Sequence, residues 1–162
     1  LAREPGLTGI AQQLRPESKG SIHVKTADAT QPPAVRFNFL SAELDKQVTL
    51  EAVRVTRKII EAPAMDKFRG AELAPGETLR SDDEILDWVK ASAETTYHPV
   101  GTCKMGADPM AVVDERLRVH GLTGLRVADA SIMPTLTSGN TNAPSIMIGE
   151  KAAAMLLEDA AQ

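Results

Sequence analysis

The chain has 162 residues, of which 43% are hydrophobic and 25% are charged, and its net charge is −4. This balance is typical of a soluble globular protein, and no apolar run reaches the roughly 20 residues of a membrane-spanning helix. No cluster of Lys and Arg marks a nucleic-acid surface, so neither nucleic acid nor a transmembrane role is expected. Cys103 is the only cysteine, which excludes an internal disulfide and leaves no convincing metal site.

The first half of the chain predicts a hairpin followed by a helix. Residues 1–19 predict an irregular leading segment, because Gly and Pro recur there. Alternating apolar residues predict two strands, at residues 21–26 and 35–39. Apolar positions three or four apart predict a helix over residues 44–60, and Pro63 should end it.

A second helix is predicted to begin after Ser81. A Ser followed three residues later by Glu84 has the capping-box spacing, in which each side chain bonds the other residue's backbone amide. This helix should fade near Glu94. Its buried side should carry Ile85, Leu86, Trp88 and Val89.

After Tyr97, Gly and Pro separate short elements. Alternation predicts strands over residues 116–119 and 125–127, joined by a turn between glycines. A final helix is predicted over residues 143–158, with a proline in its first turn and Asn142 as its N-cap. Strands and helices that follow one another without regular alternation favour an α+β fold.

Among the three histidines, His98 has the most informative surroundings. Pro99 favours an extended backbone at His98, and the glycines that follow allow close approach to a flat ligand. By itself this setting leaves open a buried histidine with satisfied hydrogen bonds. His23, in a strand-like stretch, and His120, at a Gly-flanked turn, are predicted to be surface or structural residues.

The end of the chain carries motifs that resemble a known family. Residues 125–134 read Leu-Arg-Val-Ala-Asp-Ala-Ser-Ile-Met-Pro, residues 138–144 read Ser-Gly-Asn-Thr-Asn-Ala-Pro, and residues 146–151 read Ile-Met-Ile-Gly-Glu-Lys. This stretch resembles the C-terminal signature of the glucose-methanol-choline (GMC) oxidoreductases, close to their choline dehydrogenase and alcohol dehydrogenase branch. The resemblance is densest over residues 97–154, and weaker similarity extends back to Gly20.

The resemblance implies a catalytic pair, His98 and Asn140. In the family, the histidine that matches His98 is the active-site base beside the flavin ring, and members carry His or Asn at the position of Asn140. A neutral imidazole, with an ordinary pKa of about 6.5, can accept the proton of a substrate hydroxyl. An amide can donate a hydrogen bond to the substrate oxygen and stabilise the developing alkoxide without changing its own charge.

The resemblance also implies FAD as the cofactor. It assigns Asp129 and Ala130 to the pyrophosphate and ribityl end of FAD, and the backbone of Thr141 and Asn142 to the pyrimidine edge. The start of the final helix would direct amide hydrogens and a positive dipole toward the negative charge of a reduced flavin. Asn142 can also serve simply as a helix cap.

Members of the family normally begin with a Gly-rich strand–turn–helix that binds the ADP part of FAD. No G-x-G-x-x-G motif occurs in this chain, so it resembles the last third of such an enzyme. Residues 1–96 would form a substrate-binding (cap) region, with an antiparallel sheet and flanking helices. Residues 97–162 would hold the signature and the returning piece of the FAD-binding domain. The expected partner is the N-terminal FAD-binding half of the same protein.

Two functions from different classes remain open. The first is the C-terminal part of an FAD-dependent dehydrogenase or oxidase of the EC 1.1 class, acting on an alcohol of which choline is one candidate. The chain alone would then be inactive and would bind FAD weakly. The alternative is a folding or interaction module without chemistry, which associates through exposed apolar surface. A homo-oligomer fits either function, and we expect a cytoplasmic protein or one peripherally associated with a membrane.

Overall fold

The computed structural model describes residues 5–161, which divide into two compact units. Within the described residues, the first unit comprises 5–13, 17–19 and 38–96, and the second comprises 14–16, 20–37 and 97–161. The chain passes from the first unit to the second between Thr96 and Tyr97, while the hairpin near the start of the chain groups with the second unit.

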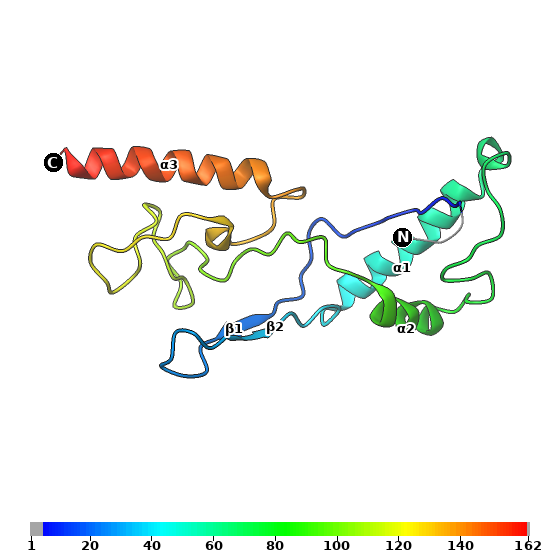
Figure 1. Cartoon of the computed structure of the whole chain (residues 1–162), viewed down its shortest axis with the longest axis horizontal. Helices are drawn as coiled ribbons and strands as arrows, with labels where there is room; N and C mark the ends of the chain where they lie inside the picture. The colour runs from blue at the N-terminus through cyan, green and yellow to red at the C-terminus, as the bar shows by residue number, and fades with distance from the viewer. Residues whose placement is uncertain (1–4, 162) are drawn as a thin grey trace. The chain divides into compact units, whose positions relative to one another are not determined.

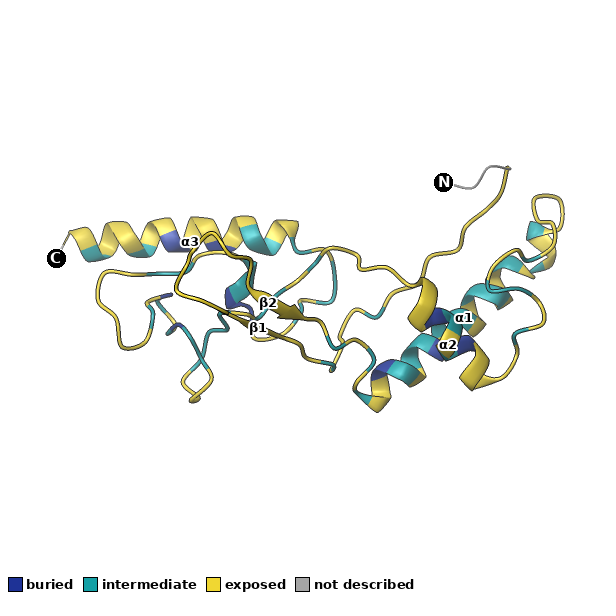
Figure 2. Cartoon of the chain, turned by 60° about the horizontal axis from the view of Figure 1, so that its bottom comes forward, coloured by how far each residue is buried: buried dark blue, intermediate teal, exposed yellow. Residues whose placement is uncertain are grey.

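The first unit is built on two helices, α1 (Glu43–Ile60) and α2 (Asp82–Ser92). Their core consists of Leu50 from α1 and of Ile85 and Val89 from α2. Figure 2 shows these buried positions where the two helices face one another. The helix predicted over residues 44–60 is confirmed, and a short 3₁₀ helix, η1 (Pro63–Met65), follows it.

The predicted capping box at the start of α2 is confirmed. Glu84 N donates to Ser81 Oγ at 3.4 Å, and Ser81 N donates to Glu84 Oε2 at 3.0 Å. The same carboxylate accepts from Ser81 Oγ at 2.7 Å. These bonds, with the amide of Arg80, hold the pKa of Glu84 below its usual range. Sequence spacing alone was sufficient here, because every partner lies within one helical turn.

Asp45 joins the leading segment to α1, and it is 4% exposed. Its Oδ1 accepts from Gln13 Nε2 at 2.7 Å and from Glu17 N at 2.9 Å, and its Oδ2 accepts from Ser18 N at 2.7 Å. Burial by itself raises the pKa of the Asp45 carboxyl, but hydrogen bonds from three residues, Ser18 foremost, outweigh it and leave the pKa below its ordinary value.

We predict that Asp45→Asn in the full-length protein lowers the free energy of unfolding by about 2 kcal/mol, because an amide NH2 replaces one oxygen that faces donors. The Asp45 contribution is present above the unfolded carboxyl pKa of about 4 and is lost as the pH falls through the lowered folded pKa. Urea denaturation at several pH values should therefore show that the difference in free energy of unfolding between variant and wild type becomes smaller in acid. The control is Asp87→Asn, which removes an exposed pair with Lys90 and should change stability little. Equal effects of the two substitutions would contradict the prediction.

The second unit contains the hairpin β1 (Ser21–His23) and β2 (Ala34–Arg36). The strands pair antiparallel, with Ile22 opposite Val35, so the predicted hairpin is confirmed but both strands are shorter than predicted (Figure 1). Gly20 lies at its base, where an added Cβ would fall 2.0 Å from Arg36 O. Only glycine permits the backbone at residue 20 to approach the backbone of β2 this closely.

The two segments predicted as strands, residues 116–119 and 125–127, pair antiparallel, but over too few residues to form strands. Among the described residues, this region forms only isolated bridges, including Val113 with Val119 and Arg118 with Arg126. The Asp114 carboxylate accepts from the backbone amides of residues 116 and 118, both at 2.9 Å, and folds this stretch into a turn. Leu117 adopts φ +65 within the turn and is 4% exposed. Its burial in the core outweighs the preference for extended backbone.

Helix α3 (Asn142–Ala160) packs on a core that the loops of the second unit build. The residues buried in this core are Val113, Leu117, Ile132, Met133, Ile148 and Ala152. At the C-terminal end of α3, Arg116 Nη2 lies 2.7 Å from Asp159 Oδ1, and Arg126 also pairs with Asp159. In Figure 2 much of the remaining surface of α3 is exposed.

Asn142 was predicted to cap α3, and this prediction is wrong. Thr141 occupies the N-cap position and Asn142 is the first helical residue. No side chain makes a capping hydrogen bond there, because the hydroxyl of Thr141 contacts His98 instead. Over residues 5–161, the three α-helices and the two-stranded antiparallel sheet are consistent with the predicted α+β class. Among the described helices, none has the length and apolar character needed to cross a membrane.

Candidate active site

The segment that follows His98 is fixed against the segment after Asp129. Cys103 N donates to Ser131 O at 3.0 Å, and Met105 N donates to Ile132 O at 2.7 Å. Gly101 has φ +86, and a Cβ there would lie 3.3 Å from Met133 O. The glycine therefore permits a backbone conformation and a close approach that a larger residue would strain. These contacts anchor the chain immediately after His98 in the core of the second unit.

His98 is half-buried and contacts Thr141, which lies 43 positions later in the chain. The distance from His98 Nδ1 to Thr141 Oγ1 is 2.9 Å, and that from Thr141 N to His98 Nδ1 is 3.4 Å. Asn140 directly precedes Thr141 and is exposed. The tertiary structure therefore joins the loop of Asn140 to the imidazole of His98 through the neighbouring threonine.

The loop that carries Asn140 is held on both sides. Arg15 Nε donates to Ser138 Oγ, and Ser138 adopts the left-handed conformation with φ +61. Thr141 is held by His98 on the other side. Between these anchors, no atom lies within 4 Å of a Cβ built on Gly139. Asn140 is thus presented from a short anchored loop, with open space beside it.

Asp129 and Ala130 lie at the short 3₁₀ helix η2 (Ala130–Ile132). Asp129 is the N-cap of η2, and its Oδ1 accepts from Ser131 N at 2.7 Å. Ala130 packs against the core of the second unit. The carboxylate is therefore used in a local turn, while its exposed side remains accessible to a ligand. Through Ser131, this segment is bonded to Cys103 in the segment after His98.

The start of α3 has the properties that suit a negatively charged ligand edge. Asn142 and Ala143 are exposed, no acidic residue lies in the first turn, and no side chain caps the helix. Amide hydrogens in a first helical turn have no intrahelical acceptor and stabilise nearby anions. The residues that the sequence assigned to the pyrimidine edge of a flavin therefore fit such a group.

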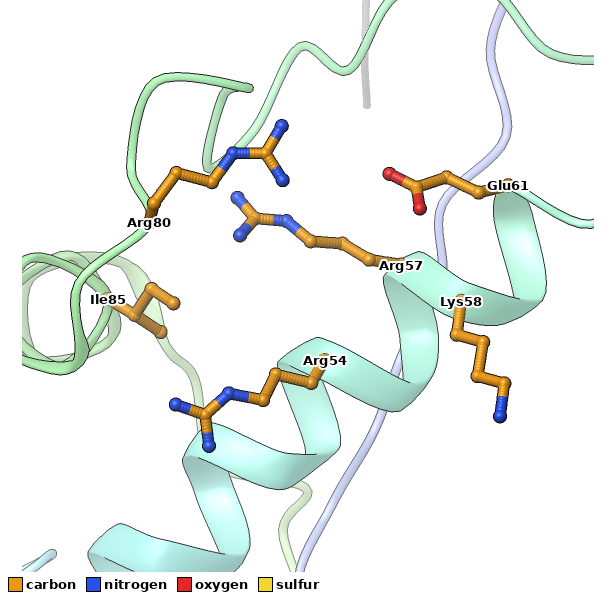
Figure 3. Close-up of a pocket in the computed structure, with 6 residues that line it drawn as sticks. All are labelled: Arg54, Arg57, Lys58, Glu61, Arg80 and Ile85. Atoms are coloured by element: carbon orange, nitrogen blue, oxygen red, sulfur yellow. The ribbon is translucent and has the colours of Figure 1, made fainter.

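The first unit contains a cavity of about 480 Å³, and the hydrogen bonds of Arg57 at its wall stabilise the fold. The side chain of Arg57 is 12% exposed and pairs with Glu72 at 3.0 Å. Its Nη1 donates to Leu79 O at 2.9 Å and its Nη2 donates to Gly76 O at 3.1 Å. Arg57 therefore holds the loop before α2 in place. Figure 3 shows Arg57 and Arg80 pointing toward one another. Six residues line the cavity: Arg54, Arg57, Lys58, Glu61, Arg80 and Ile85.

The other two histidines lie outside the candidate site. His120 is exposed, and its Nε2 donates to Gly106 O at 3.0 Å, which is a structural contact as predicted. His23 is exposed in β1. No group of three or more His, Cys, Asp or Glu residues within the described part of the chain has the arrangement of a metal site.

Two contacts of the site were not predicted from the sequence. They are the bond between Thr141 and His98 and the bond between Arg15 and Ser138. Both join residues far apart along the chain, so no local pattern indicates them. The only signal was the position of Thr141 next to Asn140 within the motif.

The family model described as GMC oxidoreductase matches residues 16–149. The oxygen-dependent choline dehydrogenase of Cronobacter sakazakii is 54% identical over 140 residues, which cover 86% of this chain and 25% of that protein. The enzyme of the same name from Escherichia coli O45:K1 is 49% identical over 154 residues, covering 95% of this chain and 27% of that protein. The chain therefore spans about a quarter of the length of the curated relatives it matches.

The chain is also similar in structure to about a quarter of each of two solved oxidoreductases. The crystal structure of pyridoxine 4-oxidase from Mesorbium loti superposes with a TM-score of 0.82 at 36% identity, covering 87% of this chain and 28% of that chain. An FAD-dependent oxidoreductase from Chaetomium thermophilum superposes with a TM-score of 0.84 at 29% identity, covering 90% of this chain and 26% of that chain.

Proposed function

The chain belongs to the GMC oxidoreductase family, and from this premise we propose that it forms the C-terminal part of an FAD-dependent enzyme that oxidises a choline-like alcohol. The proposal of choline is supported by relatives named choline dehydrogenase that are 54% and 49% identical to this chain. FAD is supported by the family and by a structural neighbour named as an FAD-dependent oxidoreductase.

The proposed reaction separates the two hydrogens of the alcohol. FAD, when bound, supplies the acceptor for the hydride that leaves the alcohol carbon. His98 accepts the hydroxyl proton at Nε2, since its Nδ1 faces Thr141. Asn140 donates from its side-chain NH2 to the same oxygen, which stabilises the developing alkoxide and fixes its orientation. Removal of a proton and a hydride leaves the carbonyl product.

Four residues are proposed to hold the cofactor. Asp129 and Ala130 at η2 would face its pyrophosphate and ribityl end, and the backbone of Thr141 and Asn142 would face the pyrimidine edge. The uncapped first turn of α3 supports the second assignment, because its amide hydrogens favour negative charge.

One observation carries the catalytic proposal. The 2.9 Å contact between His98 and Thr141 joins the histidine to the residue next to Asn140. A base and an oxyanion donor must act on the same substrate oxygen, so their segments have to meet. The contact supports the proposal, because it brings the segment of Asn140 to that of His98.

The test uses the full-length protein with bound FAD. Under anaerobic conditions, addition of choline should bleach the flavin absorbance in single-turnover mixing, whereas ethanol and pyridoxine should do so far more slowly. If no alcohol in the panel reduces the flavin, the proposed activity is wrong. If pyridoxine reduces it faster than choline, only the substrate class is wrong.

Residues 1–162 alone provide a second comparison. We expect them to bind FAD at least about 100-fold more weakly than the full-length protein, because the Gly-rich nucleotide motif is absent from this sequence. Quenching of flavin fluorescence on titration measures this. A tight stoichiometric complex would contradict it. Size-exclusion chromatography of the same sample tests the alternative function, since an interaction module should associate through exposed apolar residues of α3 such as Ile146 and Leu157.

A further inference from the structure

We propose that Arg15 is a positioning residue for the reaction, because its hydrogen bond to Ser138 fixes the loop that presents the amide of Asn140 to the substrate oxygen. This inference deepens the proposed function and rests on the assignment of Asn140 as the oxyanion donor. In this role Arg15 acts through Ser138 and Asn140 and touches neither the substrate nor the cofactor.

The donor and the acceptor of this bond are unambiguous. A guanidinium group carries only N–H donors, so Arg15 Nε donates and Ser138 Oγ accepts. The bond joins two side chains 123 positions apart in the chain, and both residues belong to the second unit. Arg15 therefore ties the leading segment to the loop between η2 and α3.

The backbone of this loop needs such an anchor. Ser138 adopts φ +61, the left-handed conformation that is unfavourable for a residue with a side chain. Gly139 follows, and glycine has the widest choice of backbone conformations of any residue. Among residues 5–161 other than its chain neighbours, no atom lies within 4 Å of a Cβ built on Gly139, so packing does not restrict its backbone. Without the bond from Arg15, the two residues before Asn140 could adopt other conformations.

Asn140 lies between two fixed points. On its C-terminal side, Thr141 contacts His98 at 2.9 Å, which holds that end of the loop beside the proposed base. On its N-terminal side, Ser138 is held by Arg15. Asn140 itself is exposed, so these two anchors limit the positions that its amide can take.

The position of the amide matters because it acts on charge that develops in the transition state. An oxyanion donor is effective when it already stands within hydrogen-bond distance of the place where that charge appears. A misplacement of about 1 Å can reduce a rate by about 10². Loss of the anchor should therefore slow the reaction even though every group that contacts the substrate is still present.

The kinetic test compares Arg15→Met and Arg15→Gln in the full-length FAD-bound protein. Methionine has a similar reach but no donor, whereas glutamine carries an N–H donor at the same number of bonds from the backbone as Arg15 Nε. We expect Arg15→Met to lower the rate constant for flavin reduction about 10-fold, with little change in bound FAD or in KM for the alcohol. Arg15→Gln should stay within about threefold of wild type, because the bond is restored without the charge. The control is Arg69→Met, which removes an exposed guanidinium that pairs with Asp66 in the first unit and should leave the rate unchanged.

A double-mutant cycle separates the positioning of Asn140 from a general structural effect. If Arg15 acts through the amide of Asn140, Arg15→Met should change the rate by no more than about twofold in a protein that already carries Asn140→Ala. A general structural effect would instead multiply the two losses.

Three results would overturn the positioning role and leave the proposed function intact. They are losses that multiply in the double variant, a wild-type rate in Arg15→Met where Asn140→Ala is slow, and an Arg15→Gln variant as slow as Arg15→Met. A wild-type rate in Asn140→Ala would instead refute the proposed function, and the role of Arg15 with it.

Discussion

Replacing His98 by alanine in the full-length protein should reduce the rate of flavin reduction by about 10² to 10⁴, the usual contribution of a positioned general base. The hydroxyl proton would then have no acceptor beside the alcohol, because the half-buried imidazole anchored to Thr141 is the group proposed to take it. Stopped-flow mixing with choline measures this step directly. Bound FAD should stay near the wild-type ratio, since the proposed cofactor contacts come from other residues.

The matched controls are His98→Gln and His120→Ala. Glutamine keeps a polar side chain of similar reach but cannot accept a proton near neutral pH, so its loss should resemble that of alanine. His120→Ala removes an exposed histidine that donates to Gly106 O, and its rate should stay close to wild type. An unchanged rate in His98→Ala, or equal losses in the His98 and His120 variants, would remove His98 from the role of base.

Asn140→Ala should cost about 10² to 10³ in the same rate constant, comparable to the loss of one oxyanion donor. The exposed amide of Asn140 stands on a loop held by Ser138 and Thr141, and its proposed bond to the substrate oxygen strengthens as negative charge develops. Because the effect belongs to the transition state, the rate should fall more than the affinity for the alcohol. Measuring flavin reduction over a range of alcohol concentrations separates the two quantities.

Two further substitutions of Asn140 sharpen this prediction. Asn140→Asp replaces the donor with a carboxylate that repels a developing alkoxide, so its loss should exceed that of alanine. Asn140→His retains a donor and matches the other residue type that the family resemblance implies at this position. It should therefore recover most of the rate. If aspartate supports the wild-type rate, Asn140 is not an oxyanion donor.

The parts of the fold that were predicted correctly depend on neighbouring residues. The helix α1 follows from apolar positions three or four apart, and the start of α2 follows from the capping box of Ser81 and Glu84. The hairpin β1–β2 follows from alternation on both sides of a breaker-rich turn. In each case the partners lie within a turn or a hairpin, so short-range stereochemistry was sufficient.

The predictions that the structure corrects were opposed by a local turn and the core in one case, and by a distant partner in the other. Residues 116–119 alternate as a strand would, but the Asp114 turn and the buried side chain of Leu117 prevent an extended ladder. Asn142 has the residue type of a cap, but the helix begins there and the hydroxyl of Thr141 is directed to His98. Extended propensity was outweighed by a local turn together with core burial in the first place, and the capping role of Thr141 was replaced by a tertiary contact in the second.

The sequence by itself determined the family, since residues 125–151 carry a dense signature that the family match over residues 16–149 confirms. It also indicated which residue types stand at the proposed base and oxyanion positions. Only the tertiary structure decided that Thr141 meets His98, that Arg15 holds Ser138, and that α3 begins without a side-chain cap. A hydrogen bond between residues 43 positions apart depends on the path of the whole intervening chain, and no periodicity or spacing encodes that path.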